Sequence, residues 1–264
     1  MKKYIVIGNP IEHSLSPILH NFWIKKNNIN AVYEKKKLEL VEIKNIILDV
    51  KDNKIEGVNV TVPFKKEVIP YLDILTLEAQ NTQSVNTIYL DKGKTVGHNT
   101  DIKGFELGVQ NIKFDFIEKD VLILGAGGVV SSIIFALNKM QVSNIFVSNR
   151  TKSKAEDLKS LFKDIKIVDW GKIPSFDIVI NATSIGLNEN DDLNIDFSKV
   201  KKNKLFYDVI YNPKETKFLK TGKKLGNKIE NGKMMFIYQA LSSFQIWHGL
   251  KPDVNNEVTK LLDK

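Results

Sequence analysis

Arg150 is the only arginine in this chain of 264 residues, and every other basic side chain among the 39 is a lysine. It follows a glycine-rich loop, Gly125-Ala126-Gly127-Gly128, within the segment Ser148-Asn149-Arg150-Thr151, with Lys154 shortly after. An NAD-binding chain usually carries an acidic residue here to bind the ribose 2'-hydroxyl. A guanidinium group instead presents a planar fork of donors that matches a phosphate. The pattern therefore predicts NADP(H) as the cofactor.

The residues around the loop predict one β-α-β unit. Val121 to Leu124 is a short apolar run typical of a buried parallel strand, Val129 to Met140 has apolar residues at helical spacing, and Asn144 to Ser148 is again strand-like. Gly125 would permit the tight turn, and the helix N-terminus would bind the pyrophosphate. A glycine-rich turn without a ligand is the alternative for such a loop taken alone. Val130, at the third fingerprint position, departs from the usual Gly or Ala.

Composition limits the possible functions. The chain is 42% apolar and has no cysteine, which excludes disulfides and thiolate sites and is compatible with a cytoplasmic setting. No apolar run reaches membrane-spanning length, and no export signal is visible after Met1. The four histidines have no paired ligand spacing, so we predict no metal site. The net charge of +8 comes from dispersed lysines without interleaved aromatics, which favours a solvated surface over nucleic-acid binding.

Strand and helix patterns alternate before the nucleotide loop. Strands are expected at residues 3–8, 31–38 and 57–62, and helices at 17–26 and 41–49. The stretch from Met234 to Leu262 has a helical period and no strands of its own. We therefore expect a first α/β domain onto which this C-terminal stretch packs.

Three polar segments in this first domain could form a site. Ser14-Leu15-Ser16-Pro17 is typical of a helix start with Ser16 as the N-cap, although two hydroxyls beside a helix N-terminus could also bind a carboxylate. Lys65 ends the segment Asn59-Val60-Thr61-Val62-Pro63-Phe64-Lys65 at a strand end, where it is either a cleft residue or a solvated lysine. Asp101, in Asn99-Thr100-Asp101, is either functional or the cap of the next helix.

Taken together, these segments resemble the shikimate dehydrogenase family over nearly the whole chain. The motifs that carry the resemblance occur in the family's order: Ser14-Leu15-Ser16-Pro17, Asn59 to Lys65, Val85-Asn86-Thr87, Asn99-Thr100-Asp101, Gly125 to Gly128, Asn149-Arg150-Thr151, Asn181-Ala182-Thr183-Ser184, Tyr207 to Pro213, and Asn231 to Met235 with Gln239-Ala240. The family reduces 3-dehydroshikimate reversibly with NADPH. The departures are Leu77, Ser84 and Val130.

The resemblance implies a role for each matching residue. Lys65 and Asp101 would be the catalytic pair. The lysine ammonium would donate a proton to the substrate oxygen that gains negative charge during hydride transfer. The small-molecule substrate would be bound by Ser14, Ser16, Thr61, Asn86, Tyr211 and Gln239. The cofactor would be bound by Gly125, Ala126, Gly127, Gly128, Val129, Asn149, Arg150, Thr151, Lys154, Thr183, Val209, Gly232 and Met235.

The implied fold is α/β with two domains. Residues 1–101 with 236–264 would form a substrate domain with a mostly parallel sheet, and residues 102–235 a Rossmann-like NADP domain, with the active site expected in the cleft between the two. Two alternatives stay open: a relative that also oxidises quinate, with broader cofactor use, and a non-catalytic regulator that binds NADP or a metabolite. We expect a monomer or homodimer without nucleic-acid or membrane partners.

Overall fold

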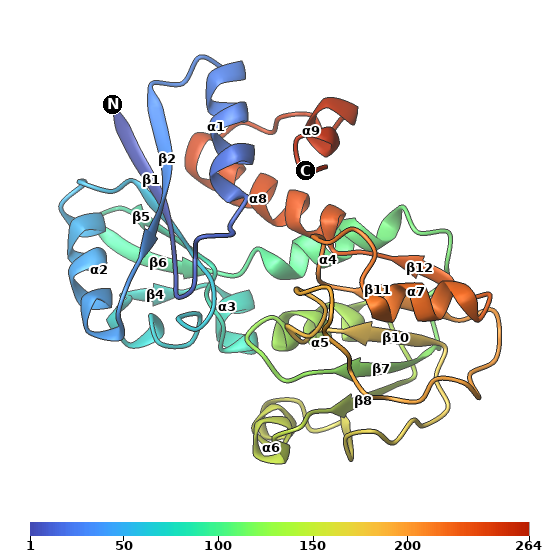
Figure 1. Cartoon of the computed structure of the whole chain (residues 1–264). Helices are drawn as coiled ribbons and strands as arrows, with labels where there is room; N and C mark the ends of the chain where they lie inside the picture. The colour runs from blue at the N-terminus through green and yellow to red at the C-terminus, as the bar shows by residue number, and fades with distance from the viewer. Residues whose placement is uncertain (264) are drawn as a thin grey trace. The chain divides into compact units, whose positions relative to one another are not determined.

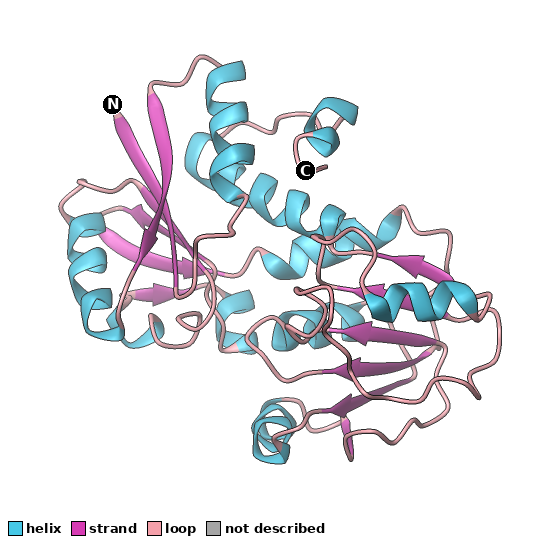
Figure 2. Ribbon diagram, viewed as in Figure 1, coloured by secondary structure: helices cyan, strands magenta, loops and turns pink. Residues whose placement is uncertain are grey.

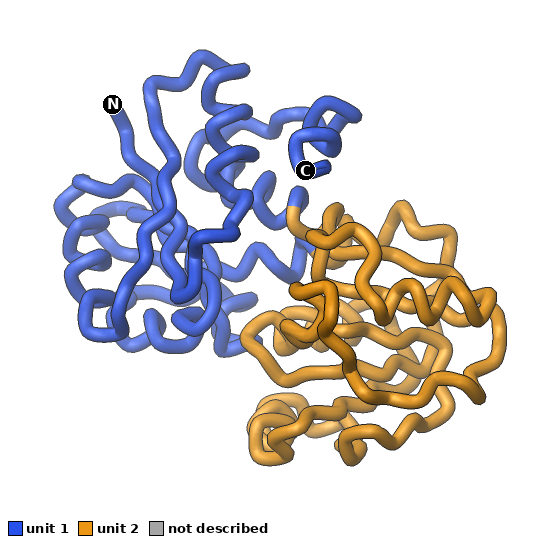
Figure 3. The backbone as a smooth tube through the Cα atoms, viewed as in Figure 1, with its two compact units in different colours: residues 1–104, 237–264 blue, residues 105–236 orange. Residues whose placement is uncertain are grey.

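The computed structural model describes residues 1–263, which form two compact units. Unit 1 comprises residues 1–104 and 237–264, and unit 2 comprises residues 105–236 (Figure 3). The chain passes from one unit to the other within helix α4 (Asp101–Gln110) and returns within α8 (Lys233–His248). No helix in the described part of the chain is long and apolar enough to cross a membrane.

Unit 1 contains a six-stranded sheet in the order β2-β1-β3-β5-β6-β4. β1 pairs in parallel with β2 and β3, β5 is antiparallel to β3 and β6, and β4 is parallel to β6. The bounds along the chain are β1 (Lys2–Gly8), α1 (Ser16–Lys26), β2 (Ala31–Lys37), η1 (Leu40–Glu42), α2 (Ile43–Lys51), β3 (Gly57–Val60), η2 (Ile69–Tyr71), β4 (Ile74–Leu75), α3 (Leu77–Thr82), β5 (Thr87–Asp91), β6 (Lys94–His98) and α9 (Asn256–Lys260).

The two faces of this sheet bury different side chains because successive strand residues point to opposite faces. Ile5 and Ile7 of β1 belong to an aliphatic core with Ile43, Ile47 and Val50 of α2. Tyr4, between them in sequence, instead contacts aromatic side chains of α8, with ring centroids 5.2 Å from Trp247 and 4.7 Å from His248. Figure 1 accordingly shows α2 on one side of the sheet and α1 with α8 on the other.

Unit 2 is a six-stranded, wholly parallel sheet in the order β12-β11-β10-β7-β8-β9. The strand order reverses beside β7, as in the doubly wound nucleotide-binding fold. Its elements are β7 (Asp120–Leu124), α5 (Val130–Lys139), β8 (Asn144–Ser148), α6 (Lys152–Leu161), β9 (Lys166–Val168), β10 (Ile178–Asn181), β11 (Leu205–Asp208), α7 (Lys217–Lys224) and β12 (Lys228–Glu230).

The central strands of unit 2, β7, β10 and β11, are buried because helices and loops cover both faces of the sheet (Figure 2). Leu122, Leu124 and Phe206 pack with Phe218 and Leu219 of α7 on one face. The interleaved residues Val121 and Ile123 are also fully buried, which agrees with near-continuous apolar strands of a parallel sheet. The predicted α/β class with a Rossmann-like second domain is confirmed.

The C-terminal stretch is helical, as its period predicts, and forms two helices: α8 ends at His248, and Gly249 adopts a φ of +68° before α9 begins at Asn256. One local prediction is wrong. Ser16 is not the N-cap of α1: Leu15 occupies that position without a side-chain capping bond, and Ser16 is the first helical residue. The Ser14 hydroxyl instead accepts a hydrogen bond from the Ser16 backbone N–H at 3.3 Å.

Candidate active site

Lys65 and Asp101 form a buried ion pair in unit 1. Lys65 lies in the turn that follows β3, where its carbonyl accepts a hydrogen bond from the Val85 N–H at 2.9 Å. Asp101 is the first residue of α4. The two residues are only 8% and 6% exposed, which excludes the solvated-lysine interpretation of Lys65.

Asp101 does not cap the helix that it begins. The first-turn N–H groups of Asp101 and Ile102 donate to the side-chain oxygen of Asn99, at 3.0 and 3.3 Å. The Asn99 amide nitrogen donates in turn to the Ser84 carbonyl at 2.9 Å and to Thr82 Oγ1 at 3.1 Å. Because Asn99 provides the capping bonds, the Asp101 carboxylate is available to Lys65.

The Asn86 side chain holds the second oxygen of that carboxylate. Its amide nitrogen donates to Asp101 Oδ1 at 2.9 Å, and its oxygen accepts from the Thr100 backbone N–H at 2.7 Å. A backbone N–H can only donate, so the Asn86 oxygen must face Thr100 and the NH₂ group must face Asp101. Both Asp101 oxygens are therefore held by donors, one from Lys65 and one from Asn86.

The other predicted substrate-binding residues of unit 1 follow strands or lie on α8. Thr61 comes directly after β3, and its N–H donates to the Ile7 carbonyl at 2.9 Å, which brings it beside the end of β1. Ser14 and Ser16 lie between β1 and α1, and neither serine bonds to Lys65 or Asp101 within residues 1–263. Gln239 is a half-buried residue of α8.

Tyr211 belongs to unit 2, unlike the other predicted substrate-binding residues. It is half-buried, follows β11, and stacks on Phe236 with ring centroids 4.5 Å apart.

The glycine-rich loop of unit 2 provides a cradle for a phosphate group. Gly125 has a φ of +114°, and a Cβ there would lie 2.8 Å from the Ala182 carbonyl oxygen, so only glycine fits this turn. A Cβ on Gly127 would meet no heavy atom within 4 Å. Gly127 therefore presents open space directly before the N-terminus of α5, where backbone N–H groups favour an anion. Ala126, Gly128 and Val129 complete this turn.

The end of β8 carries the expected cationic group. Arg150 and Lys154 are exposed, and neither side chain makes an ion pair or a hydrogen bond with any other residue in 1–263. Thr151 is the N-cap residue of α6 without a side-chain capping bond, and Asn149 donates to its carbonyl at 2.7 Å. Two unpaired cations beside a helix N-terminus fit the adenosine 2'-phosphate of NADP.

Two of the residues predicted for the nicotinamide end, Thr183 and Val209, lie at the carboxyl ends of β10 and β11. Thr183 Oγ1 donates to the Asn181 side-chain oxygen at 2.7 Å, and the Val209 N–H donates to the Asn181 carbonyl at 2.9 Å. A Cβ on Gly232 would lie 2.0 Å from the Val209 oxygen, so the two backbones are in contact. The structure thus brings Thr183, Val209 and Gly232 together. Met235, three residues further on, is buried in α8.

Sequence reasoning missed the buried carboxylate that connects these segments. Asp208 accepts hydrogen bonds from the Thr216 hydroxyl at 2.6 Å, the Ile210 N–H at 3.0 Å and the Asn181 amide at 3.1 Å. Burial raises the pKa of Asp208 to about 6, and these hydrogen bonds oppose the rise. An acidic residue at the end of an otherwise apolar strand, within the motif Tyr207 to Pro213, was the available signal.

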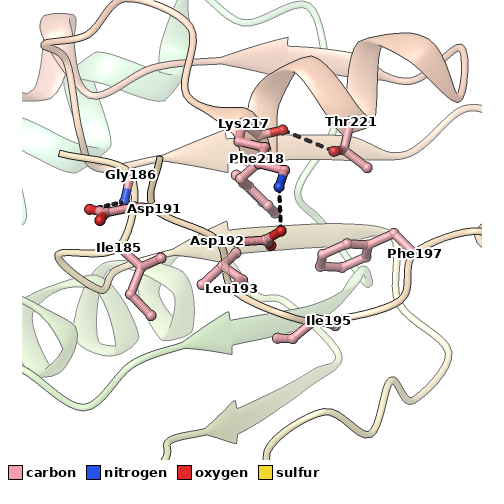
Figure 4. Close-up of a pocket in the computed structure, with 10 residues that line it drawn as sticks. All are labelled: Ile185, Gly186, Asp191, Asp192, Leu193, Ile195, Phe197, Lys217, Phe218 and Thr221. Carbon is pink, nitrogen blue, oxygen red and sulfur yellow. Dashed lines mark hydrogen bonds and ion pairs between the residues drawn. The ribbon is translucent and has the colours of Figure 1, made fainter. Parts of the chain in front are cut away.

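A pocket in unit 2 contains none of the predicted site residues (Figure 4). It lies between the segment after β10 and helix α7, and Ile185, Phe197 and Phe218 provide apolar walls. Its polar groups already have partners, since Asp192 forms an ion pair with Lys217 and Asp191 accepts from the Gly186 N–H. This pocket is therefore separate from the glycine-rich loop.

Comparisons with known proteins identify the family. The model of the shikimate dehydrogenase substrate-binding domain matches residues 6–88, and the shikimate/quinate 5-dehydrogenase model matches residues 106–217. An NADP(+) shikimate dehydrogenase of Pelagibacter ubique is 56% identical over 262 residues, which is 99% of each chain.

Solved structures agree with this assignment. The crystal structure of shikimate dehydrogenase from Aquifex aeolicus has a TM-score of 0.91 and 36% identity, covering 100% of this chain and 98% of that one. A second shikimate dehydrogenase, crystallised in complex with NADP+, also has a TM-score of 0.91 and 36% identity, covering 100% and 95%. The expected family is confirmed: the chain belongs to the shikimate dehydrogenase family.

Proposed function

We propose that this protein catalyses the reversible NADPH-dependent reduction of 3-dehydroshikimate to shikimate, a step in the biosynthesis of chorismate and the aromatic amino acids. The observation that carries the proposal is the buried Lys65–Asp101 ion pair, held on its other side by Asn86. A protein that only binds a nucleotide or metabolite has no need of a buried proton-transfer pair. Family membership and the NADP-type loop of unit 2 support the same reaction.

Lys65 carries the proton in this proposal. When bound, NADPH supplies the hydride that reduces the ketone carbon. The ketone oxygen then gains negative charge, and the Lys65 ammonium stabilises it and donates the proton. In the reverse direction the Lys65 amine accepts the hydroxyl proton. Asp101 orients Lys65 through the ion pair and accepts a hydrogen bond from a substrate hydroxyl.

The remaining polar residues bind the substrate. Ser14 and Ser16 hold its carboxylate, and Thr61, Asn86, Tyr211 and Gln239 provide contacts to the carboxylate and ring hydroxyls. A polyol is discriminated from its analogues by such paired donors and acceptors, because a missing partner leaves a buried polar group unpaired. In this proposal residues 1–101 with 236–264 form the substrate domain.

NADP(H) is bound by residues 102–235. The turn from Gly125 to Val129 holds the pyrophosphate, while Asn149, Arg150, Thr151 and Lys154 bind the 2'-phosphate. Thr183, Val209, Gly232 and Met235 line the nicotinamide. The fit of the group is supported by the open space at Gly127 and the unpaired guanidinium of Arg150.

A substrate and cofactor panel tests the proposed function. The purified protein is mixed with shikimate or quinate, each with NADP or NAD, and nicotinamide absorbance is followed. We expect reduction confined to shikimate with NADP. Comparable rates with quinate or NAD would assign the chain to the broader quinate-oxidising class. If a folded protein binds NADPH but turns over no pair, the regulator alternative is correct and the enzymatic proposal fails.

The proposal also includes a cytoplasmic setting, the absence of nucleic-acid partners, and a monomeric or homodimeric state. Light scattering after gel filtration measures the oligomeric state directly. A stable assembly larger than a dimer would contradict this part.

A further inference from the structure

A cluster of buried polar side chains next to Asp101 connects the sheet of unit 1 to helix α8. Its members are Asn59, Asn86, Thr87, Thr100 and Ser243. Asn59 of β3 donates from its amide nitrogen to the Asn86 carbonyl at 3.0 Å and to the Ser243 hydroxyl at 3.0 Å. Ser243 Oγ lies 2.8 Å from Thr87 Oγ1 and 3.2 Å from Thr100 Oγ1. All of these residues are less than 9% exposed. Neither Asn59 nor Ser243 is among the residues predicted to bind substrate or cofactor.

The orientation of the Asn59 amide is determined by its partners. The Asn86 carbonyl only accepts, so the Asn59 NH₂ group must face it. The Asn59 oxygen accepts from the Tyr33 hydroxyl at 2.7 Å. Burial raises the pKa of Tyr33 well above its usual value, so that hydroxyl stays protonated and donates. Every polar group of the Asn59 amide is therefore used within the protein.

The cluster also fixes the Asn86 side chain. The Asn86 oxygen accepts from the hydroxyls of Thr87 at 3.0 Å and Thr100 at 3.1 Å, in addition to the Thr100 N–H. Thr87 Oγ1 accepts from the Asn59 amide nitrogen at 3.2 Å, and because its own proton goes to Asn86, the Ser243 hydroxyl donates to it at 2.8 Å. The fully occupied oxygen keeps the Asn86 NH₂ group directed at Asp101. Neither Asn59 nor Ser243 bonds to Lys65 or Asp101 directly; their hydrogen bonds reach the ion pair through Asn86 and through Thr100, which precedes Asp101.

We propose that Asn59 and Ser243 are positioning residues of the reaction, which act through Asn86 to hold the Asp101 carboxylate in place for Lys65. This inference rests on the proposed function, in which Lys65 and Asp101 carry the proton transfer. Loss of either partner removes hydrogen bonds that restrain the Asn86 side chain, so that it can shift relative to Asp101, and a small displacement of a catalytic group lowers the rate strongly. The effect falls on kcat, whereas NADP contacts, which belong to unit 2, are unchanged.

Helix α8 offers a matched control for Ser243→Ala. Both hydroxyls lie near the carbonyl four residues earlier: Ser242 donates to Tyr238 at 2.9 Å, and Ser243 Oγ is 3.1 Å from the Gln239 oxygen. Only Ser243 also contacts the strand residues of the cluster. Ser242→Ala therefore removes a hydroxyl from the same helix without touching Asn59 or Thr87. Tyr33→Phe is a second mild variant, because its ring keeps the stack on His20 at 4.1 Å.

The experiment measures kcat and KM for shikimate and NADP, together with the melting temperature, for Asn59→Ala, Ser243→Ala, Tyr33→Phe and Ser242→Ala. We expect the first two to lose about tenfold or more in kcat with the KM for NADP unchanged. Tyr33→Phe lowers kcat less, and Ser242→Ala stays within about twofold of the parent. Adding Asn59→Ala to Asn86→Ala lowers kcat by no more than about twofold further, since Asn59 acts through Asn86.

A purely structural cluster gives a different result. In that case Ser243→Ala and Asn59→Ala lower the melting temperature while kcat of the folded protein stays within about twofold of the parent, and the inference is overturned. Should Asn59→Ala fail to fold, Ser243→Ala and Tyr33→Phe decide the question. Failure of the proposed function is distinct, because the parent protein itself would then show no turnover with shikimate and NADP.

Discussion

The ammonium group of Lys65 pairs with the carboxylate of Asp101, although 36 positions separate them in the chain. Burying two charges costs desolvation energy that their attraction often does not fully offset. Such a pair is weak evidence for stability and stronger evidence for chemistry, because buried charge partners in an enzyme family's motif positions are typical of proton-transfer sites. The bond from Asn86 to the second carboxylate oxygen at 2.9 Å keeps Asp101 fixed toward Lys65.

Arg150 is expected to select NADP over NAD. If Arg150 binds the 2'-phosphate as proposed, Arg150→Leu removes a charge-assisted bidentate contact, and the KM for NADP should rise about tenfold or more. NAD lacks that phosphate, so its KM stays nearly constant. Arg150→Lys should recover part of the loss, since it keeps the charge without the fork. Steady-state kinetics with both cofactors measure these values.

Lys163→Leu is the control for Arg150→Leu, because Lys163 is another exposed cation beyond the end of α6. It should leave both KM values unchanged. An equal rise of KM for NAD and NADP in Arg150→Leu would show that Arg150 does not contact the 2'-phosphate.

Two glycines of the same loop should respond differently to alanine. In Gly125→Ala the new Cβ meets the Ala182 carbonyl at a φ of +114°, so the melting temperature falls. In Gly127→Ala the Cβ meets no protein atom, so the melting temperature stays the same while NADP binding weakens. Thermal melts and cofactor titration separate the two effects. Unchanged NADP affinity in a folded Gly127→Ala protein would mean that the pyrophosphate lies elsewhere.

His20 is expected to make the protein sensitive to acid. Burial lowers its pKa from 6.5 to about 3, with a smaller contribution from His248, and neither ring nitrogen has a hydrogen-bond partner within residues 1–263. The pKa of His20 is lower in the folded protein than in the unfolded chain, so burying the neutral ring carries no protonation cost above pH 6.5, and the folded state has its full stability there. As the pH falls from 6.5 toward 3, the free energy of unfolding decreases by up to about 1.4 kcal/mol per pH unit, because only the unfolded chain binds the proton.

His20→Phe should remove that sensitivity while keeping an aromatic ring against Tyr33. The free energy of unfolding, measured by urea titration between pH 7 and 4.5, should fall less steeply in the variant than in the parent. Parallel curves for the two proteins would contradict a buried, neutral His20.

The sequence allowed much of the fold to be predicted because its strongest patterns are local. The β-α-β unit around Gly125 needs only short-range periodicity and one turn. The family resemblance supplied Lys65 and Asp101, which no spacing rule joins. The assignment of each predicted residue to substrate or cofactor remains a prediction.

The parts that could not be predicted depend on long-range contacts or on side-chain geometry. Ser243 meets Asn59 across 184 positions, so no window of sequence contains the pair. Asn99 and Asp101 are both good capping residues, and only the folded backbone decides that Asn99 provides the bonds. The break after α8 did have a signal, since Gly249 and Pro252 are typical of a helix end.

Turnover of Lys65→Met with shikimate and NADP tests the central claim most directly. Methionine keeps the length of the side chain without a proton to donate, and Lys66→Met, at the exposed neighbouring position, is the control. With folding checked by thermal melt, kcat should fall at least about a hundredfold while shikimate and NADP binding change far less. Turnover that persists in a folded Lys65→Met protein would contradict the role of Lys65 and of its pair with Asp101.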